Sequence, residues 1–130
     1  MKTDDQSVIL EYQIALSDDG SYIRITFFVD MTNELAERSL FEGYRLSEET
    51  GVLKHLIDVT RVRSAQSTTD MYMLAYKRLS VSPLYRNFKI AVVTHPDDNS
   101  HDFVETLLLN IGANGKVFKN EDKAIAWLKE

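Results

Sequence analysis

Three hydroxyl side chains lie in a short segment that the residue spacing places at the start of a helix. Ser64, Ser67 and Thr68 lie close together, and Ser67 stands three residues before Asp70, the spacing of a capping box. The free backbone N–H groups at a helix start stabilise an anion. A phosphoryl group on one of these hydroxyls would add about two negative charges there. We therefore take these residues as candidate phosphorylation or partner-binding sites, with a plain helix cap as the alternative.

Asp58 is a candidate site residue because of its position. It lies near the end of residues 53–59, an apolar stretch that is typical of a strand and that precedes the hydroxyl-rich segment. In open α/β sheets, ligands and regulatory chemistry collect at the carboxyl edge of the strands. Two roles are open for Asp58. It caps the following loop, or it accepts a phosphoryl group or recognises a partner.

Two tyrosines suggest a docking surface on the helix that follows Ser67. Tyr72 and Tyr76 are four residues apart and lie off the apolar stripe of that helix. Exposed aromatic side chains at this spacing are common in protein interfaces. The alternative is that both are half-buried against a neighbouring helix.

The motifs of catalysis and metal binding are missing from the sequence. It has no cysteine, no Gly-x-Ser-x-Gly elbow and no glycine-rich phosphate loop, and His55, His95 and His101 lack a ligand-like spacing. We expect a protein that is not an enzyme, with no cofactor and no metal. His55 is expected to be a structural residue of its strand, exposed or hydrogen-bonded. A metal site in the polar loop near His95 and His101 is the alternative, with ligands from Asp97, Asp98 or Asp102.

Length and charge set limits on the partners. The chain has 130 residues, a length that predicts one domain, and we place it at residues 8–130 after a flexible polar tail at residues 1–7. The net charge is −5. Negative charge argues against nucleic acid and against an anionic membrane surface. No apolar run approaches the roughly 18 residues of a membrane span, and residues 1–7 lack the features of a signal peptide. We expect a cytoplasmic protein.

Apolar periodicity predicts an α/β fold with the order β-β-α-β-α-β-α-β-α. The first two strands, residues 8–16 and 22–29, are separated by a short turn and form an antiparallel hairpin. Strands and helices then alternate, which favours a mostly parallel sheet with right-handed crossovers. The expected later elements are a helix at 32–50, a strand at 53–59, a helix between Ser67 and Ser82-Pro83, a strand at 88–94, a helix around 103–111, a strand at 116–118 and a helix at 121–129.

The last third of the chain resembles a known family. Residues 88–93 read Phe-Lys-Ile-Ala-Val-Val, residues 110–118 end in Lys-Val-Phe, and residues 121–128 close with Ala-Trp-Leu. This ending is similar to that of the SpoIIAA-like domains, also called STAS or SEC14-like. The order of elements resembles the family along nearly the whole chain.

The resemblance implies the fold of anti-sigma factor antagonists and of the cytoplasmic domains of sulfate transporters. Those domains are non-enzymatic switches, in which a partner kinase phosphorylates a serine at the helix start after the third strand. The antagonists show a segment like Asp-Ser-Ser-Gly-Leu there, whereas residues 65–69 read Ala-Gln-Ser-Thr-Thr, with Ser67 nearest in place. The same broad fold includes carriers of apolar, lipid-like ligands.

Three functions are therefore open. The first is an interaction module that binds a protein partner and is switched by Ser/Thr phosphorylation. The second is a carrier or sensor of a small apolar ligand. The third is a phosphoacceptor domain with Asp58 as acceptor, although the predicted hairpin lacks the adjacent pair of acids that would hold magnesium. A homodimer through an exposed edge strand is compatible with each of them.

Overall fold

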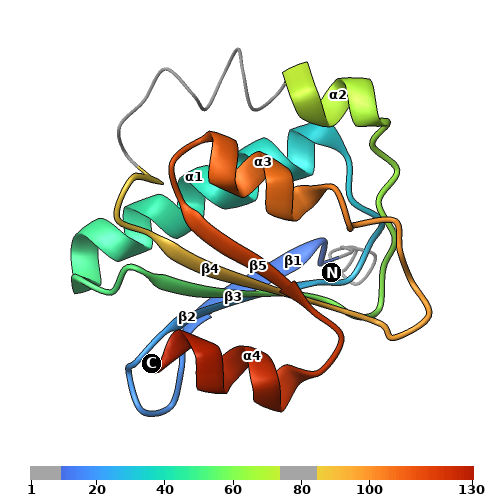
Figure 1. The fold of residues 1–130 in the computed structure, drawn as a ribbon. Helices are drawn as coiled ribbons and strands as arrows, with labels where there is room; N and C mark the ends of the chain where they lie inside the picture. The colour runs from blue at the N-terminus through green and yellow to red at the C-terminus, as the bar shows by residue number, and fades with distance from the viewer. Residues whose placement is uncertain (1–9, 74–84) are drawn as a thin grey trace, which may run out of the picture.

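The computed structural model describes residues 10–73 and 85–130, which form a five-stranded sheet with helices on both faces (Figure 1). The strands lie side by side in the order of the sequence: β1 (Tyr12–Leu16), β2 (Ile23–Phe27), β3 (Lys54–Val59), β4 (Lys89–Thr94) and β5 (Asn114–Phe118). The helices are α1 (Asn33–Thr50), α2 (Thr68–Met73), α3 (Val104–Asn110) and α4 (Glu121–Leu128). The predicted α/β class and element order are confirmed.

The sheet is mixed, as predicted. β1 and β2 pair antiparallel, with Ile14 opposite Ile25, and the other neighbouring strands pair parallel. Between β1 and β2, the carboxylate of Asp19 accepts hydrogen bonds from the hydroxyls of Ser17 and Ser21 and so holds the tight turn. β1 lies at one edge of the sheet and β5 at the other.

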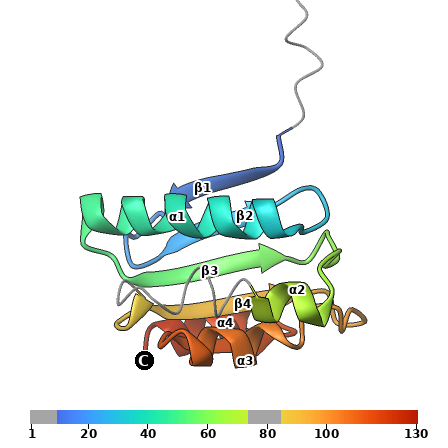
Figure 2. The same ribbon diagram turned by 90° about the horizontal axis from the view of Figure 1, so that it is seen from above.

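Helices α1, α2 and α3 cover one face of the sheet and α4 covers the other (Figure 1). Seen from above, α1 lies toward β1 and β2, whereas α3 lies toward β4 (Figure 2). Helix α3 also packs against β5. Side chains alternate along each strand, so that Leu56 packs beneath α4 while Val59 packs on the face shared by α1 and α3. The strand β4 is buried on both faces, as its continuous apolar sequence predicts.

The ends of α1 agree with the sequence prediction, but its buried face differs. Thr32 caps the helix start by accepting a hydrogen bond from the N–H of Leu35, and Gly51 ends the helix at a φ of 78°. Helical spacing of the apolar residues predicts a buried stripe of Leu35, Ala36, Leu40 and Tyr44. This is only partly right, because the fully buried residues are Leu35, Ser39, Gly43 and Ser47. Small side chains let the helix approach the sheet closely. A Cβ on Gly43 would lie 3.0 Å from the ring of His55.

Several predictions fall outside the described residues. They are the tail at residues 1–7, the start of the first strand at residues 8–9, Tyr76 and the helix end at Ser82-Pro83. The same holds for Leu74, Ala75 and Leu79, which apolar spacing predicts on the buried face of the helix after Ser67. Among residues 10–73 and 85–130, no helix is both long and apolar enough to cross a membrane.

Candidate functional site

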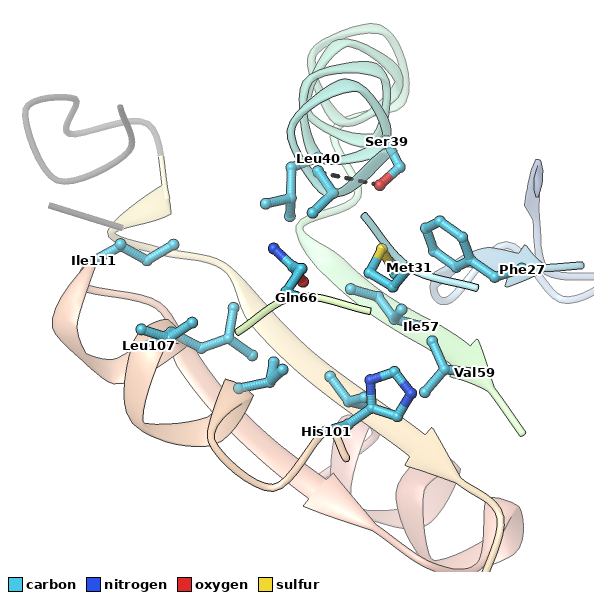
Figure 3. A pocket seen from close by; sticks show the side chains of 14 residues that line it. Phe27, Met31, Ser39, Leu40, Ile57, Val59, Gln66, His101, Leu107 and Ile111 are labelled. Atoms are coloured by element: carbon cyan, nitrogen blue, oxygen red, sulfur yellow. Dashed lines mark hydrogen bonds between the residues drawn. The ribbon is translucent and has the colours of Figure 1, made fainter. Parts of the chain in front are cut away.

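An apolar pocket lies between α1 and α3, above the middle strands of the sheet (Figure 3). Its cavity volume is about 90 Å³ and its lining is almost entirely apolar. The described residues that line it are Phe27, Met31, Ala36, Ser39, Leu40, Ile57, Val59, Gln66, Val92, His101, Val104, Leu107, Leu108 and Ile111. A concave apolar pocket with few polar groups is the usual form of a small-molecule site.

The periodicity of the elements places these side chains. Ile57 and Val59 are two residues apart on β3 and therefore share a face of the sheet, where they form the floor with Phe27 and Val92. Leu107 and Leu108 lie next to each other on the buried face of α3. The other wall comes from α1, whose contribution includes the small Ala36 and Ser39.

The loop after β3 is held firmly across the carboxyl edge of the sheet. The N–H of Arg63 donates to the carboxylate of Asp30 at 2.9 Å, and the N–H of Ser64 donates to the hydroxyl of Ser100 at 2.9 Å. The backbone of Met31 also bonds to this loop on both sides of Ser64. This anchoring brings Gln66 to the pocket, where its amide Nε2 donates to the Oδ1 of Asn33 at 2.6 Å.

A buried acid and a buried histidine stand side by side at the pocket. Asp98 and His101 are each about 2% exposed, and the Oδ2 of Asp98 lies 3.6 Å from the Nε2 of His101. Desolvation alone would raise the pKa of Asp98. Hydrogen bonds from Ser100 and the electrostatic interactions with His101 and Arg63 outweigh it and lower that pKa below the usual value. The sequence predicts a polar loop here, with a metal site as the alternative; the loop is present, but Asp98 and His101 within it are buried.

A second, polar hollow of about 250 Å³ opens at the carboxyl edge of the sheet on the other side of Asp98. Its described lining is Thr60, Arg61, Val62, Arg63, His95 and Asp98. Arg63 reaches the Oδ1 of Asp98 at 3.3 Å. Asp98 therefore lines this hollow while its neighbour His101 lines the apolar pocket.

The predicted hydroxyl residues lie together at the start of α2. Ser67 and Asp70 form the reciprocal pair of a capping box: the N–H of Asp70 donates to the Oγ of Ser67 at 3.0 Å, and the N–H of Ser67 faces the carboxylate of Asp70 at 3.4 Å. Ser64 is half-buried, and its Oγ accepts from the N–H of Gln66. Thr68 begins α2.

The structure separates Asp58 from these hydroxyls. Asp58 lies on the α4 face of the sheet, where its Oδ1 accepts from the N–H and the hydroxyl of Thr60 and its Oδ2 accepts from Arg24 at 2.9 Å. Arg24 also bonds to Glu121 in the first turn of α4. Desolvation would raise the pKa of Asp58, but the bonds from Thr60 and the charge of Arg24 lower it. This geometry matches the loop-capping role.

Of the two tyrosines, Tyr72 lies in α2 and Tyr76 lies outside the described residues. The residues that sequence reasoning missed are those that line the apolar pocket. The sequence carries only a weak signal for this pocket, because its lining residues come from six separate stretches that the tertiary fold brings together. The one local feature that points to this site is the three-residue spacing of Asp98 and His101, which brings the two side chains together.

Comparison with known proteins supports the fold. No family model and no curated protein matches the chain. The structure is similar to the crystal structure of an uncharacterised protein of the DUF3478 family with a SpoIIAA-like fold, from Shewanella loihica PV-4. The TM-score is 0.52 at 21% sequence identity, over 90% of this chain and 91% of the other. The chain thus has a SpoIIAA-like fold, and the resemblance inferred from its ending is confirmed at that level.

Proposed function

We propose that this protein is a non-enzymatic binding protein that takes a small apolar ligand into the pocket between α1 and α3. The observation that carries the proposal is the apolar lining of that pocket, built from both helices and three strands. Burial of apolar surface releases about 25 cal/mol per Å², so such a lining favours apolar ligands over water.

The size of the pocket limits the size of the ligand. A cavity of roughly 150 Å³ is enough to hold benzene. Among the described residues, the pocket has a cavity volume of about 90 Å³ and is partly open. It fits a short alkyl chain or the inner part of one ring, with the rest of the ligand outside.

Binding of toluene, followed by ¹⁵N–¹H NMR spectra, tests this proposal. We expect toluene to shift resonances of residues that line the pocket, such as Val59 and Leu107. The variant Val104→Phe fills the pocket from α3 and should abolish these shifts, provided that its own spectrum is that of a folded protein. Leu109→Phe is the matched control, because Leu109 lies on the same helix and is 56% exposed. Wild-type spectra that do not change with toluene would contradict the proposal.

A second candidate function is an interaction module that binds a protein partner and is switched by phosphorylation near the start of α2. It is favoured by the exposure of Ser67, whose Oγ is also the acceptor that caps α2. A phosphoryl group there would act directly on the first helical turn and would lie beside the carboxylate of Asp70.

Mass spectrometry of protein purified from its own host separates the two candidates. Extra mass that survives denaturation and maps to Ser64, Ser67 or Thr68 would support the phosphorylation switch. Extra mass seen only under native conditions would support the apolar ligand and would also give its mass. A bare chain in both spectra would speak against a tightly bound ligand and against stable phosphorylation.

A further inference from the structure

We infer that the ligand of the apolar pocket carries one oxygen group, a hydroxyl or a carboxylate, that meets the imidazole of His101. The inference rests on the proposed function and adds the chemical class of the ligand. It comes from the few polar side chains of the lining, Ser39, Gln66 and His101. The hydroxyl of Ser39 already donates to the backbone oxygen of Ala36, and the amide of Gln66 donates to Asn33.

The orientation of His101 leaves one of its ring nitrogens for an occupant. Nε2 lies 3.3 Å from the backbone oxygen of Val62 and 3.6 Å from the carboxylate of Asp98, so this nitrogen faces the loop after β3. Nδ1, which is one ring carbon away from Nε2, has no such contact among the described residues. Figure 3 shows the ring at one end of the pocket, next to Val59. The ring is therefore the polar end of an otherwise apolar wall.

The buried carboxylate of Asp98 determines which hydrogen-bonding group His101 presents to a ligand. The Oδ2 of Asp98 is buried and has no hydrogen-bond partner among the described residues, so it favours a proton on the facing Nε2. Neutral His101 then presents a lone pair on Nδ1, which accepts from a hydroxyl. Protonated His101 presents an N–H, which donates to a carboxylate. A plain hydrocarbon would cover Nδ1 without a partner, which carries a desolvation cost.

Toluene, phenol and benzoate form a matched set of probes, because a methyl, a hydroxyl or a carboxylate stands on the same ring. We expect phenol or benzoate to bind about tenfold more tightly than toluene, the effect of one hydrogen bond. Tighter binding of phenol assigns the hydroxyl, and tighter binding of benzoate assigns the carboxylate. Equal affinity for all three probes would overturn this inference and leave the proposed function standing. If none of them binds, the proposed function fails.

The imidazole itself supplies a readout that needs no variant. With ¹⁵N-labelled histidine, the Nδ1 resonance of His101 should move much further on binding of the preferred oxygen-bearing probe than on binding of toluene. The double variant Asp98→Asn with His101→Phe tests the assignment, because it removes the imidazole together with its buried charged neighbour. Asp98→Asn alone is its control, because it keeps the imidazole. The double variant should bind the three probes with similar affinity. A double variant that keeps the tenfold preference would refute the role of His101.

Discussion

The Oγ of Ser47 on α1 and the Nε2 of His55 on β3 lie 2.7 Å apart in the interior and join the helix to the sheet by a hydrogen bond. His55 is about 1% exposed, and its Nδ1 has no hydrogen-bond partner among the described residues. Burial lowers the pKa of His55 to about 4, because an imidazolium there would lose its hydration. His55 is therefore neutral in the folded protein at neutral pH.

This burial predicts a loss of stability in mild acid. An unfolded chain binds a proton on His55 near pH 6.5, whereas the folded chain binds it only near pH 4. Between these values the unfolded state gains protons that the folded state lacks, so the free energy of unfolding falls as the pH falls. We expect a loss of about 3 kcal/mol across the window, measured by urea unfolding.

The variant His55→Gln is the control for this prediction. It lacks the titrating group and should lose far less stability over the same window, although it starts from a lower value. The ring resonances of His55, followed by NMR, give an independent check. A pKa near 6.5 in the folded protein would contradict the account.

The close contact between β5 and α3 predicts a cost for any side chain at Gly115. A Cβ at Gly115 would lie 2.5 Å from the Cβ of Leu108, which leaves no room for Gly115→Ala without a shift of α3. We expect Gly115→Ala to lower the free energy of unfolding by about 1–3 kcal/mol in thermal or urea unfolding. Asn114→Ala, at the exposed neighbouring position, should change it little.

A double variant tests the cause of that cost. Leu108→Ala alone creates a cavity and should cost about 2–5 kcal/mol. If the clash with Leu108 is responsible, Leu108→Ala and Gly115→Ala together should cost less than the sum of the two. Strictly additive effects would show that Gly115 is needed for another reason.

The bonds of Asp58 predict that this residue stabilises the fold and does not act in binding. Asp58→Ala removes the acceptor for Thr60 and leaves Arg24 without one of its two acids. We expect a loss of about 1–3 kcal/mol, because the site is largely buried. Glu121→Ala, at the exposed partner, should cost less than about 1 kcal/mol.

Toluene binding gives the second readout for Asp58. The pocket lies on the opposite face of the sheet, so folded Asp58→Ala should keep the affinity of the wild type. A large loss of binding in this variant would place Asp58 in the binding function after all.

The capping box predicts a local effect at α2. Ser67→Ala removes the acceptor for the N–H of Asp70 and should destabilise the helix start by about 1 kcal/mol. Ser67→Asp should keep the cap, since aspartate is an equally good N-cap. Hydrogen exchange of the amides in α2 measures the difference, and Thr69→Ala, exposed in the same turn, is the control. Unchanged exchange in Ser67→Ala would show that the cap contributes nothing.

The elements that were predicted correctly have local causes. The capping box at Ser67 and Asp70 depends on two residues three apart in the chain. The hairpin depends on a turn of a few residues between two β-branched strands. Such features are determined by neighbouring residues, and the sequence alone predicts them well.

The features that were missed depend on packing between distant segments. Ser39, Gly43 and Ser47 are small or polar, so hydropathy does not mark them as the buried face of α1. Asp98 and His101 stand in a segment that reads as a polar loop, and they are buried because the loops after β3 and β4 close over them. The apolar pocket follows from the placement of α1 relative to α3, which no single stretch of sequence encodes.

The order of the strands has a consequence for how the chain acquires its structure during synthesis. Each strand pairs with the one that precedes it, so a chain emerging from the ribosome can add every new βα unit to an edge that already exists. Only the β1–β2 pairing is local, because the parallel pairings join residues such as Ile23 and His55 or Lys54 and Lys89, far apart in the chain, and parallel pairing of this kind slows folding. Among the described residues, it is α4 that covers the far face of the middle strands, with Leu56, Ala91 and Val93. Until that last helix is translated, the nascent protein exposes an apolar strip on which chaperones can act.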